Sequence, residues 1–91
     1  MNEEQRLNFV FSLDVGDTVG IYDVPFGDVS QAKFAGNDIV ARITPTGVIR
    51  LWSTRGLFDR QGFGKGRSRP NIGNSGKVLG IPKWPTIIGA S

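Results

Sequence analysis

The residues of this chain best suited to chemistry are arginines interleaved with aromatic residues in its second half. Guanidinium groups bind phosphates through paired hydrogen bonds, and aromatic rings stack on nucleic-acid bases with about 1–3 kcal/mol per base. The pattern therefore predicts a surface that contacts nucleic acid, DNA or RNA, or another partner. Its candidate residues are Arg42, Arg50, Trp52, Arg55, Arg60, Phe63, Lys65, Arg67, Arg69 and Trp84.

The aromatic members of this set have a structural alternative. A domain of this size needs its large aromatic side chains in the core, which favours core positions for Trp52 and Phe58 over binding positions. The arginines would then form an ordinary solvated face. A core position is less favoured for Phe63, because its neighbours Gly62 and Gly64 offer no side chains for packing.

The composition excludes the commonest catalytic groups. The 91 residues include no Cys and no His, so Ser-His and Cys-His pairs, disulfides and zinc sites built from these residues cannot form. The string GFGKGRSR lacks the spacing of a phosphate-binding P-loop, although its amides, with Lys65 and Arg67, could form a loose anion site. Asp14 and Asp17 are explained by turns rather than by a metal. We predict a non-enzymatic binding module without metal or cofactor.

The charge is unevenly divided along the chain. Lys and Arg number 11 against 8 Asp and Glu, a net charge of +3. Residues 1–41 hold seven acids and two bases, or −5, whereas residues 42–91 hold nine bases and one acid, or +8. Such asymmetry predicts an electrostatic partner. The alternative is that the two halves neutralise each other across facing strands.

The elements that must position these residues are predicted to be mainly strands. Acidic residues at the start and apolar residues at spacings of three and four favour a short helix within residues 1–11, with an early strand as the alternative. Residues 18–24 are β-branched and aromatic, which predicts a strand that Pro25 and Gly27 end.

The clearest predicted element is a hairpin over residues 39–53. Two β-rich runs flank residues 45–47, where Pro sets the first turn dihedral and Gly accepts a positive one. If the register brings them together, Arg42, Arg50 and Trp52 share one face. The opposite, buried face is predicted to hold Ile39, Ile43, Ile49 and Leu51.

Residues 62–80 have a different texture. They contain six of the 13 glycines and four bases without an acid, so we expect a mobile segment that buries too little apolar surface to offset its ordering entropy. Taken together, residues 1–91 are predicted to form one mainly β domain. Its fold class is a small SH3-like or partly open antiparallel barrel, with a short N-terminal helix and a flexible Gly/Arg-rich loop.

Three strings, VGDTVGIYD, IVARITPTGVIRLW and FDRQGFGKG, carry a family resemblance. The chain resembles a class of small, mostly uncharacterised β-domain proteins encoded by bacteriophages and related mobile elements. The matching residues are 43–49 and 58–62, followed by Gly66. The resemblance implies a small SH3-like barrel or twisted sheet, and no particular activity.

Three hypotheses about partners follow. The first is binding of nucleic acid through the basic half. The second is a phage accessory protein that docks on a host protein and inhibits or redirects it, with Trp84 between Pro82 and Pro85 as an anchor. The third is a homo-oligomer that forms through exposed strand edges and the apolar C-terminal run. No apolar run approaches the roughly 20 residues of a membrane span, so we expect no membrane partner and a cytoplasmic location, in a bacterial host if the gene is phage-encoded.

Overall fold

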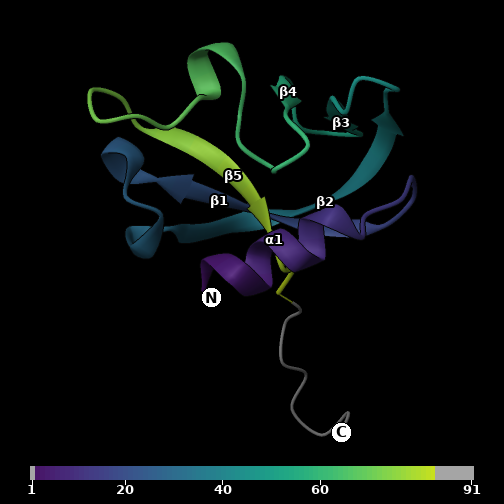
Figure 1. Ribbon diagram of the computed structural model, residues 1–91, viewed down its shortest axis with the longest axis horizontal. Coiled ribbons are helices and arrows are strands. Elements are labelled where there is room, and N and C mark those ends of the chain that lie inside the picture. The colour runs from purple at the N-terminus through teal and green to yellow at the C-terminus, as the bar shows by residue number, and fades with distance from the viewer. Residues whose placement is uncertain (1, 84–91) are drawn as a thin grey trace, which may run out of the picture.

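The computed structural model describes residues 2–83 and confirms a mainly β fold with one N-terminal helix (Figure 1). Three 3-10 helices interrupt the connections: η1 (Pro25–Gly27), η2 (Val29–Gln31) and η3 (Gly66–Ser68). The main elements are α1 (Glu3–Phe11), β1 (Thr18–Val24), β2 (Lys33–Ile43), β3 (Ile49–Leu51), β4 (Leu57–Phe58) and β5 (Gly76–Gly80).

The five strands form one antiparallel sheet that curls into a partly open barrel. Their order is β4-β3-β2-β1-β5, and the long strand β2 pairs with β1 through its first half and with β3 through its second. Residues 62–65 lie between the two ends of the sheet: the Lys65 amide donates to the Leu57 carbonyl at 2.9 Å, and the Gly64 amide donates to the Lys77 carbonyl at 2.8 Å. These bonds connect β4 to β5, as the predicted barrel requires.

The predicted hairpin is confirmed, and its turn follows the sequence chemistry. The Thr44 amide donates to the Val48 carbonyl and the Gly47 amide to the Thr44 carbonyl, both at 2.9 Å. Gly47 has φ +88°, a conformation that glycine adopts without a steric cost.

One face of the hairpin differs from its prediction, because β2 contains a bulge. Val40 pairs with Leu51 and Arg42 with Arg50, so Ala41 is an extra residue that changes the phase of the alternation. Val40 is therefore fully buried, whereas Ile39 points outward and is 43% exposed. The expectation that Ile39 belongs to the buried face is wrong. Ile49 and Leu51 are buried as predicted, and Ile43 is partly buried.

Helix α1 packs its C-terminal half against the inner face of the sheet, where the main core forms (Figure 1). The Asn2 side chain caps its first turn by accepting from the Gln5 amide at 2.7 Å. None of the helices within residues 2–83 is long and apolar enough to cross a membrane. The main core consists of Val10, Leu13, Val19, Ile21, Val40, Ile49, Leu51, Phe58 and Leu79, and a second, smaller cluster consists of Tyr22, Val24 and Val78.

Residues 62–80 contribute more to the core than their composition indicates. Their last five residues form β5, which is bonded to β1 on one side and to residues 62–65 on the other. Val78 and Leu79 are fully buried there, so the expectation of little apolar burial is wrong for this strand. The reason is that β5 lies between β1 and residues 62–65, which glycine content does not reveal. Mobility of the loop before β5 stays a prediction.

Candidate nucleic-acid interface

A row of cations crosses the outside of the barrel. Residues directly opposite each other on paired strands point to the same face, so the pairs Arg42–Arg50 and Arg50–Leu57 lie in one line. The antiparallel β-bridge between Phe58 and Gly64 places Lys65 opposite Leu57. The line therefore continues from β4 onto a fourth segment, residues 62–65. All four side chains of the row are exposed: Arg42, Arg50, Leu57 and Lys65.

Trp52 and Ile39 lie next to this row on the same side of the sheet. The Trp52 amide donates to the Ile39 carbonyl at 3.0 Å, which places the two residues opposite each other. Trp52 is 72% exposed, so the favoured core interpretation is wrong for this residue, because Leu51 takes the inward position of β3. Phe58 is 1% exposed and its core position is confirmed. We call the surface formed by Ile39, Arg42, Arg50, Trp52, Leu57 and Lys65 the outer face.

A groove of about 400 Å³ opens at the Ile39 end of the outer face and is lined by Thr18, Asn37, Asp38, Ile39 and Ser53. Asp38 is the buried residue of this lining. Its carboxylate accepts from the Thr54 hydroxyl at 2.6 Å, the Thr54 amide at 2.7 Å, the Ile39 amide at 2.7 Å and the Ser53 amide at 3.2 Å. These bonds hold the turn that follows Trp52.

The protonation of Asp38 is set by two opposing effects. Burial raises its pKa, whereas the hydrogen bonds from Thr54, Ile39 and Ser53 lower it, and the lowering effects together prevail. The pKa of Asp38 therefore lies below its ordinary value, and the group is a carboxylate at neutral pH.

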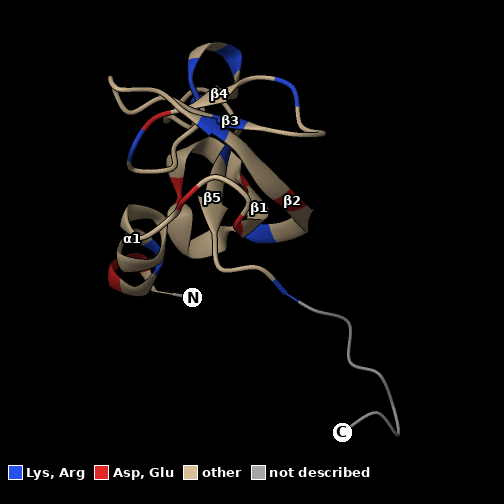
Figure 2. Cartoon of the chain, turned by 90° about the vertical axis from the view of Figure 1, so that its right-hand side faces the viewer, with Lys and Arg blue, Asp and Glu red and all other residues tan. Residues whose placement is uncertain are grey.

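Further cations lie in the two loops beside β4. Arg55 is in the turn after β3, and Arg67 and Arg69 are in or next to η3; all three are exposed. A Cβ atom on Gly56 would lie 3.9 Å from the Ser68 hydroxyl oxygen, so these two loops are neighbours. Figure 2 shows basic residues around β3 and β4 and in the loop at the top of the view, while most acidic residues lie toward α1, β1 and β2.

Acidic side chains of residues 2–83 form no ion pair with the cations of this region. Among residues 2–83 the ion pairs are Arg6–Glu3 and Lys77–Asp23, at 2.5 and 2.6 Å, and only the second joins the acidic half to the basic half. Within the described part of the chain, the two halves are therefore joined by one ion pair rather than by facing rows of opposite charge. Six side chains make no ion pair or hydrogen bond to another described residue: those of Arg42, Arg50, Arg55, Lys65, Arg67 and Arg69.

Two candidates have structural positions instead. The Arg60 guanidinium donates to the Val10 carbonyl at 2.7 Å and to the Phe11 carbonyl at 2.8 Å, at the C-terminal end of α1. Phe63 is half-buried, and the Arg6 guanidinium carbon lies 4.6 Å from the centre of its ring. Neither belongs to the outer face, and a binding role for them stays a prediction. Trp84 lies outside the described residues.

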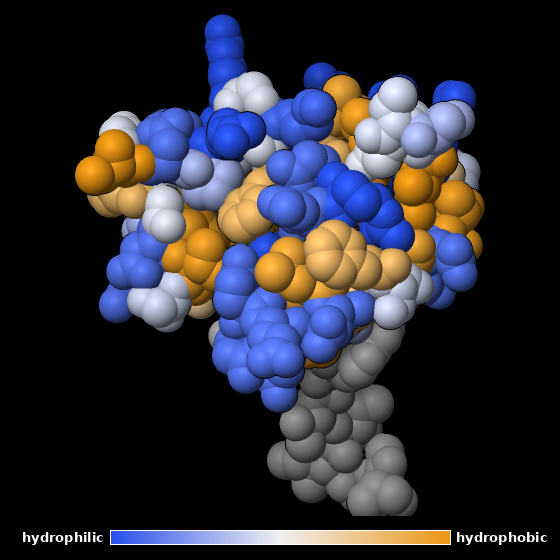
Figure 3. Space-filling model, in the orientation of Figure 1, coloured by the Kyte–Doolittle hydropathy of each residue, from blue (hydrophilic) through white to orange (hydrophobic). Residues whose placement is uncertain are grey.

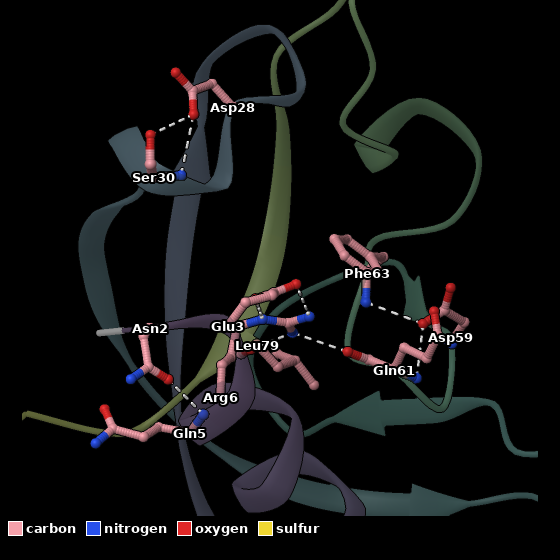
Figure 4. A network of polar contacts seen from close by, with 10 residues as sticks. All are labelled: Asn2, Glu3, Gln5, Arg6, Asp28, Ser30, Asp59, Gln61, Phe63 and Leu79. Atoms are coloured by element: carbon pink, nitrogen blue, oxygen red, sulfur yellow. Dashed lines mark hydrogen bonds and ion pairs between the residues drawn. The ribbon is translucent and has the colours of Figure 1, made fainter.

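Arg6 and Asp38 are the important residues that the sequence pattern did not indicate. Arg6 is fully buried, and its guanidinium donates to the Gln61 carbonyl at 2.8 Å and the Leu79 carbonyl at 3.0 Å while it pairs with Glu3 (Figure 4). Arginine is seldom buried, and these partners lie more than 50 positions away, so no local signal exists. For Asp38 the only hint is an acid directly before the predicted hairpin, at whose other end Ser53 and Thr54 lie.

Comparisons with protein-family models, curated proteins and solved structures found no match to this chain. The resemblance to phage-encoded proteins therefore stays a prediction. Within residues 2–83, no cluster of three or more acidic, His or Cys side chains could hold a metal ion. Function is accordingly inferred from the outer face itself.

Proposed function

We propose that this protein is a non-enzymatic module that binds nucleic acid through its outer face. The observation that carries the proposal is the row Arg42, Arg50 and Lys65 beside the exposed Trp52, on one side of one sheet. Cations that contact phosphates and an aromatic ring that contacts bases are the two components that such surfaces combine.

The pairing of Arg42 with Arg50 supports a polyanionic ligand. Like charges directly opposite each other destabilise a sheet by a few tenths of a kcal/mol or more, and no acid of the described chain offsets them. A bound phosphate backbone would remove this repulsion. The arrangement is therefore unfavourable for the free protein and favourable for the complex.

The test measures binding of labelled single-stranded and duplex oligonucleotides, both DNA and RNA, by fluorescence anisotropy over a range of salt concentrations. The triple variant Arg42→Gln, Arg50→Gln, Lys65→Gln should lose at least about tenfold in affinity at low salt. The slope of log K against log salt should fall by about 2–3, the value for three lost phosphate contacts.

A matched control removes the same charge away from the outer face. The variant Lys33→Gln, Lys77→Gln, Lys83→Gln changes the net charge equally, and its affinity should stay close to that of the wild type. Equal losses in the two variants would show that net charge, rather than the outer face, determines binding. Absence of wild-type binding at low salt would reject the proposal.

A second candidate is docking on a host protein, as expected of a phage accessory protein. Phe26 and Ile72 are 62% and 94% exposed. Their loops are neighbours, since a Cβ atom on Gly27 would lie 3.1 Å from the Asn71 carbonyl carbon. Phe26 has φ +46°, which is unusual for a bulky residue. Figure 3 shows apolar atoms at the surface on the side of these loops.

This candidate is tested by capture from nuclease-treated bacterial lysate at high salt. A protein partner that survives both treatments, is lost with Phe26→Ser and Ile72→Ser, and is retained by the outer-face triple variant supports docking through the two loops. A partner that disappears with nuclease supports the first candidate instead.

A further inference from the structure

We infer that the nucleic acid bound by the outer face is single-stranded and that Trp52 stacks on one of its unpaired bases. The inference rests on the proposed function and names its ligand class. It starts from the position of Trp52, which is 72% exposed on a sheet surface that also carries Arg50 and Ile39.

The exposed ring needs a ligand that offers the flat face of a base. In a duplex each base is stacked between its neighbours, and a protein reaches only the base edges in the grooves. An unpaired base exposes its π-face, and stacking on Trp contributes about 1–3 kcal/mol. A duplex could contact the arginines of the outer face through its backbone, but it would leave Trp52 without a stacking partner.

The width of the outer face also disfavours insertion into a duplex groove. From Arg42 to Lys65 the row crosses four neighbouring segments, and three inter-strand spacings amount to about 14 Å. The major groove is about 12 Å wide and admits a helix or a two-stranded ribbon. A surface four segments wide fits a flexible single strand that lies across it.

The groove beside Ile39 is positioned to hold the nucleotide next to the base stacked on Trp52. Its volume of about 400 Å³ falls within the range of small-molecule sites, and it adjoins the residue opposite Trp52. Among the described residues, the Asn37 amide is occupied by the Lys83 backbone and the Asp38 carboxylate by the Ser53–Thr54 turn. The rest of the lining consists of apolar Ile39 and the hydroxyl-bearing residues Thr18 and Ser53.

The experiment uses the fluorescence of Trp52 in the full-length chain. The chain has two tryptophans, so a Trp84→Phe background, first shown to bind like the wild type, makes Trp52 the sole reporter. The probes are an oligothymidine of about ten nucleotides, within the site size of single-strand binders, and a duplex of equal length. The single strand should quench Trp52 emission and bind about tenfold or more tightly than the duplex.

Two substitutions make the result specific. Trp52→Ala should weaken single-strand binding by about 5- to 150-fold, the equivalent of one lost stacked base, and leave duplex binding unchanged. Trp52→Phe, measured in the presence of Trp84, should retain most of the affinity. Because Trp52 is exposed, the unfolding midpoints of both variants should match that of the wild type.

The outcomes separate this inference from the proposed function. If single strand and duplex bind equally and Trp52→Ala changes neither affinity, the single-strand inference is overturned while nucleic-acid binding stands. If neither probe binds at low salt, the proposed function itself fails.

Discussion

Asp38 is a buried carboxylate that accepts hydrogen bonds from the turn after β3, which follows Trp52 directly. Each carboxylate oxygen of Asp38 accepts from at least one backbone amide. In an asparagine at this position, the side-chain NH₂ group would replace one of these oxygens and face a backbone N–H, so two donors would meet. The orientation of the Trp52 end of the outer face therefore depends on one residue of β2.

Asp38→Asn should lower the free energy of unfolding by about 1–3 kcal/mol, because buried amides lose a charged acceptor. Since the folded-state pKa of Asp38 lies below its unfolded value, the carboxylate stabilises the fold above the unfolded pKa, near 4. This contribution is lost as the pH falls through the folded pKa.

Urea unfolding at pH about 7 and at progressively lower pH measures this effect. The wild type should lose more stability in acid than Asp38→Asn. Asp14→Asn is the control, since that exposed side chain accepts no hydrogen bond from a described residue, and its effect should stay within about 0.5 kcal/mol. Equal effects of the two substitutions would contradict the role of Asp38.

Arg6 joins α1 to the two segments that close the barrel, through the Gln61 and Leu79 carbonyls. Arg6→Met keeps an unbranched side chain at this buried position but leaves these acceptors without their charged donor. The free energy of unfolding should fall by about 2–4 kcal/mol in urea titrations. Glu3→Gln removes only the half-exposed partner and should cost less than about 1 kcal/mol. An Arg6→Met variant as stable as the wild type would mean that the carbonyls find other donors.

At the scale of elements, helix α1 ends without a basic residue in its own last turn. Arg60, from the loop after β4, supplies the missing cation by donating to the carbonyls of Val10 and Phe11. Cations at helix C-termini stabilise the aligned peptide dipoles and satisfy carbonyls that lack a helical donor. The helix is thus fixed to the sheet at both ends, by Arg6 near its start and Arg60 at its end.

Arg60→Ala should reduce stability by about 1–2 kcal/mol, with loss of helical signal in circular dichroism before the main transition. Arg50→Ala is the matched control, because Arg50 is exposed and makes no ion pair within the described chain. It should leave stability nearly unchanged and reduce oligonucleotide affinity more than Arg60→Ala does. The reverse ranking would assign the binding role to Arg60.

For the whole molecule, the division of charge persists after folding. The basic residues of the outer face lie together, and a single ion pair, Lys77–Asp23, connects the two halves among residues 2–83. Closure of the barrel by residues 62–65 also covers the free edges of β4 and β5, which reduces the strand edges open to self-assembly. Homo-oligomer formation stays a prediction, to be measured by light scattering.

The repulsion within the outer face predicts an unusual stability effect. The triple variant Arg42→Gln, Arg50→Gln, Lys65→Gln should be as stable as the wild type or more stable by about 0.5–1 kcal/mol at low salt. The difference should shrink near 0.5 M salt, where screening is strong. Urea unfolding at the two salt concentrations measures it. A less stable variant would show that these cations support the fold, and its loss of binding could then reflect unfolding.

Local sequence alone determined the N-terminal helix, the strand at residues 18–24, the hairpin turn and the position of the positive charge. These features depend on spacing and turn chemistry between near neighbours, so they could be predicted. Only the tertiary structure decided that Trp52 points outward, that Ile39 accompanies it and that Arg6, Arg60 and Asp38 hold the fold. The physical reason is that a one-residue bulge at Ala41 changes which face of β2 is buried, and the hydrogen bonds of Arg6 and Arg60 join residues about 50 or more positions apart.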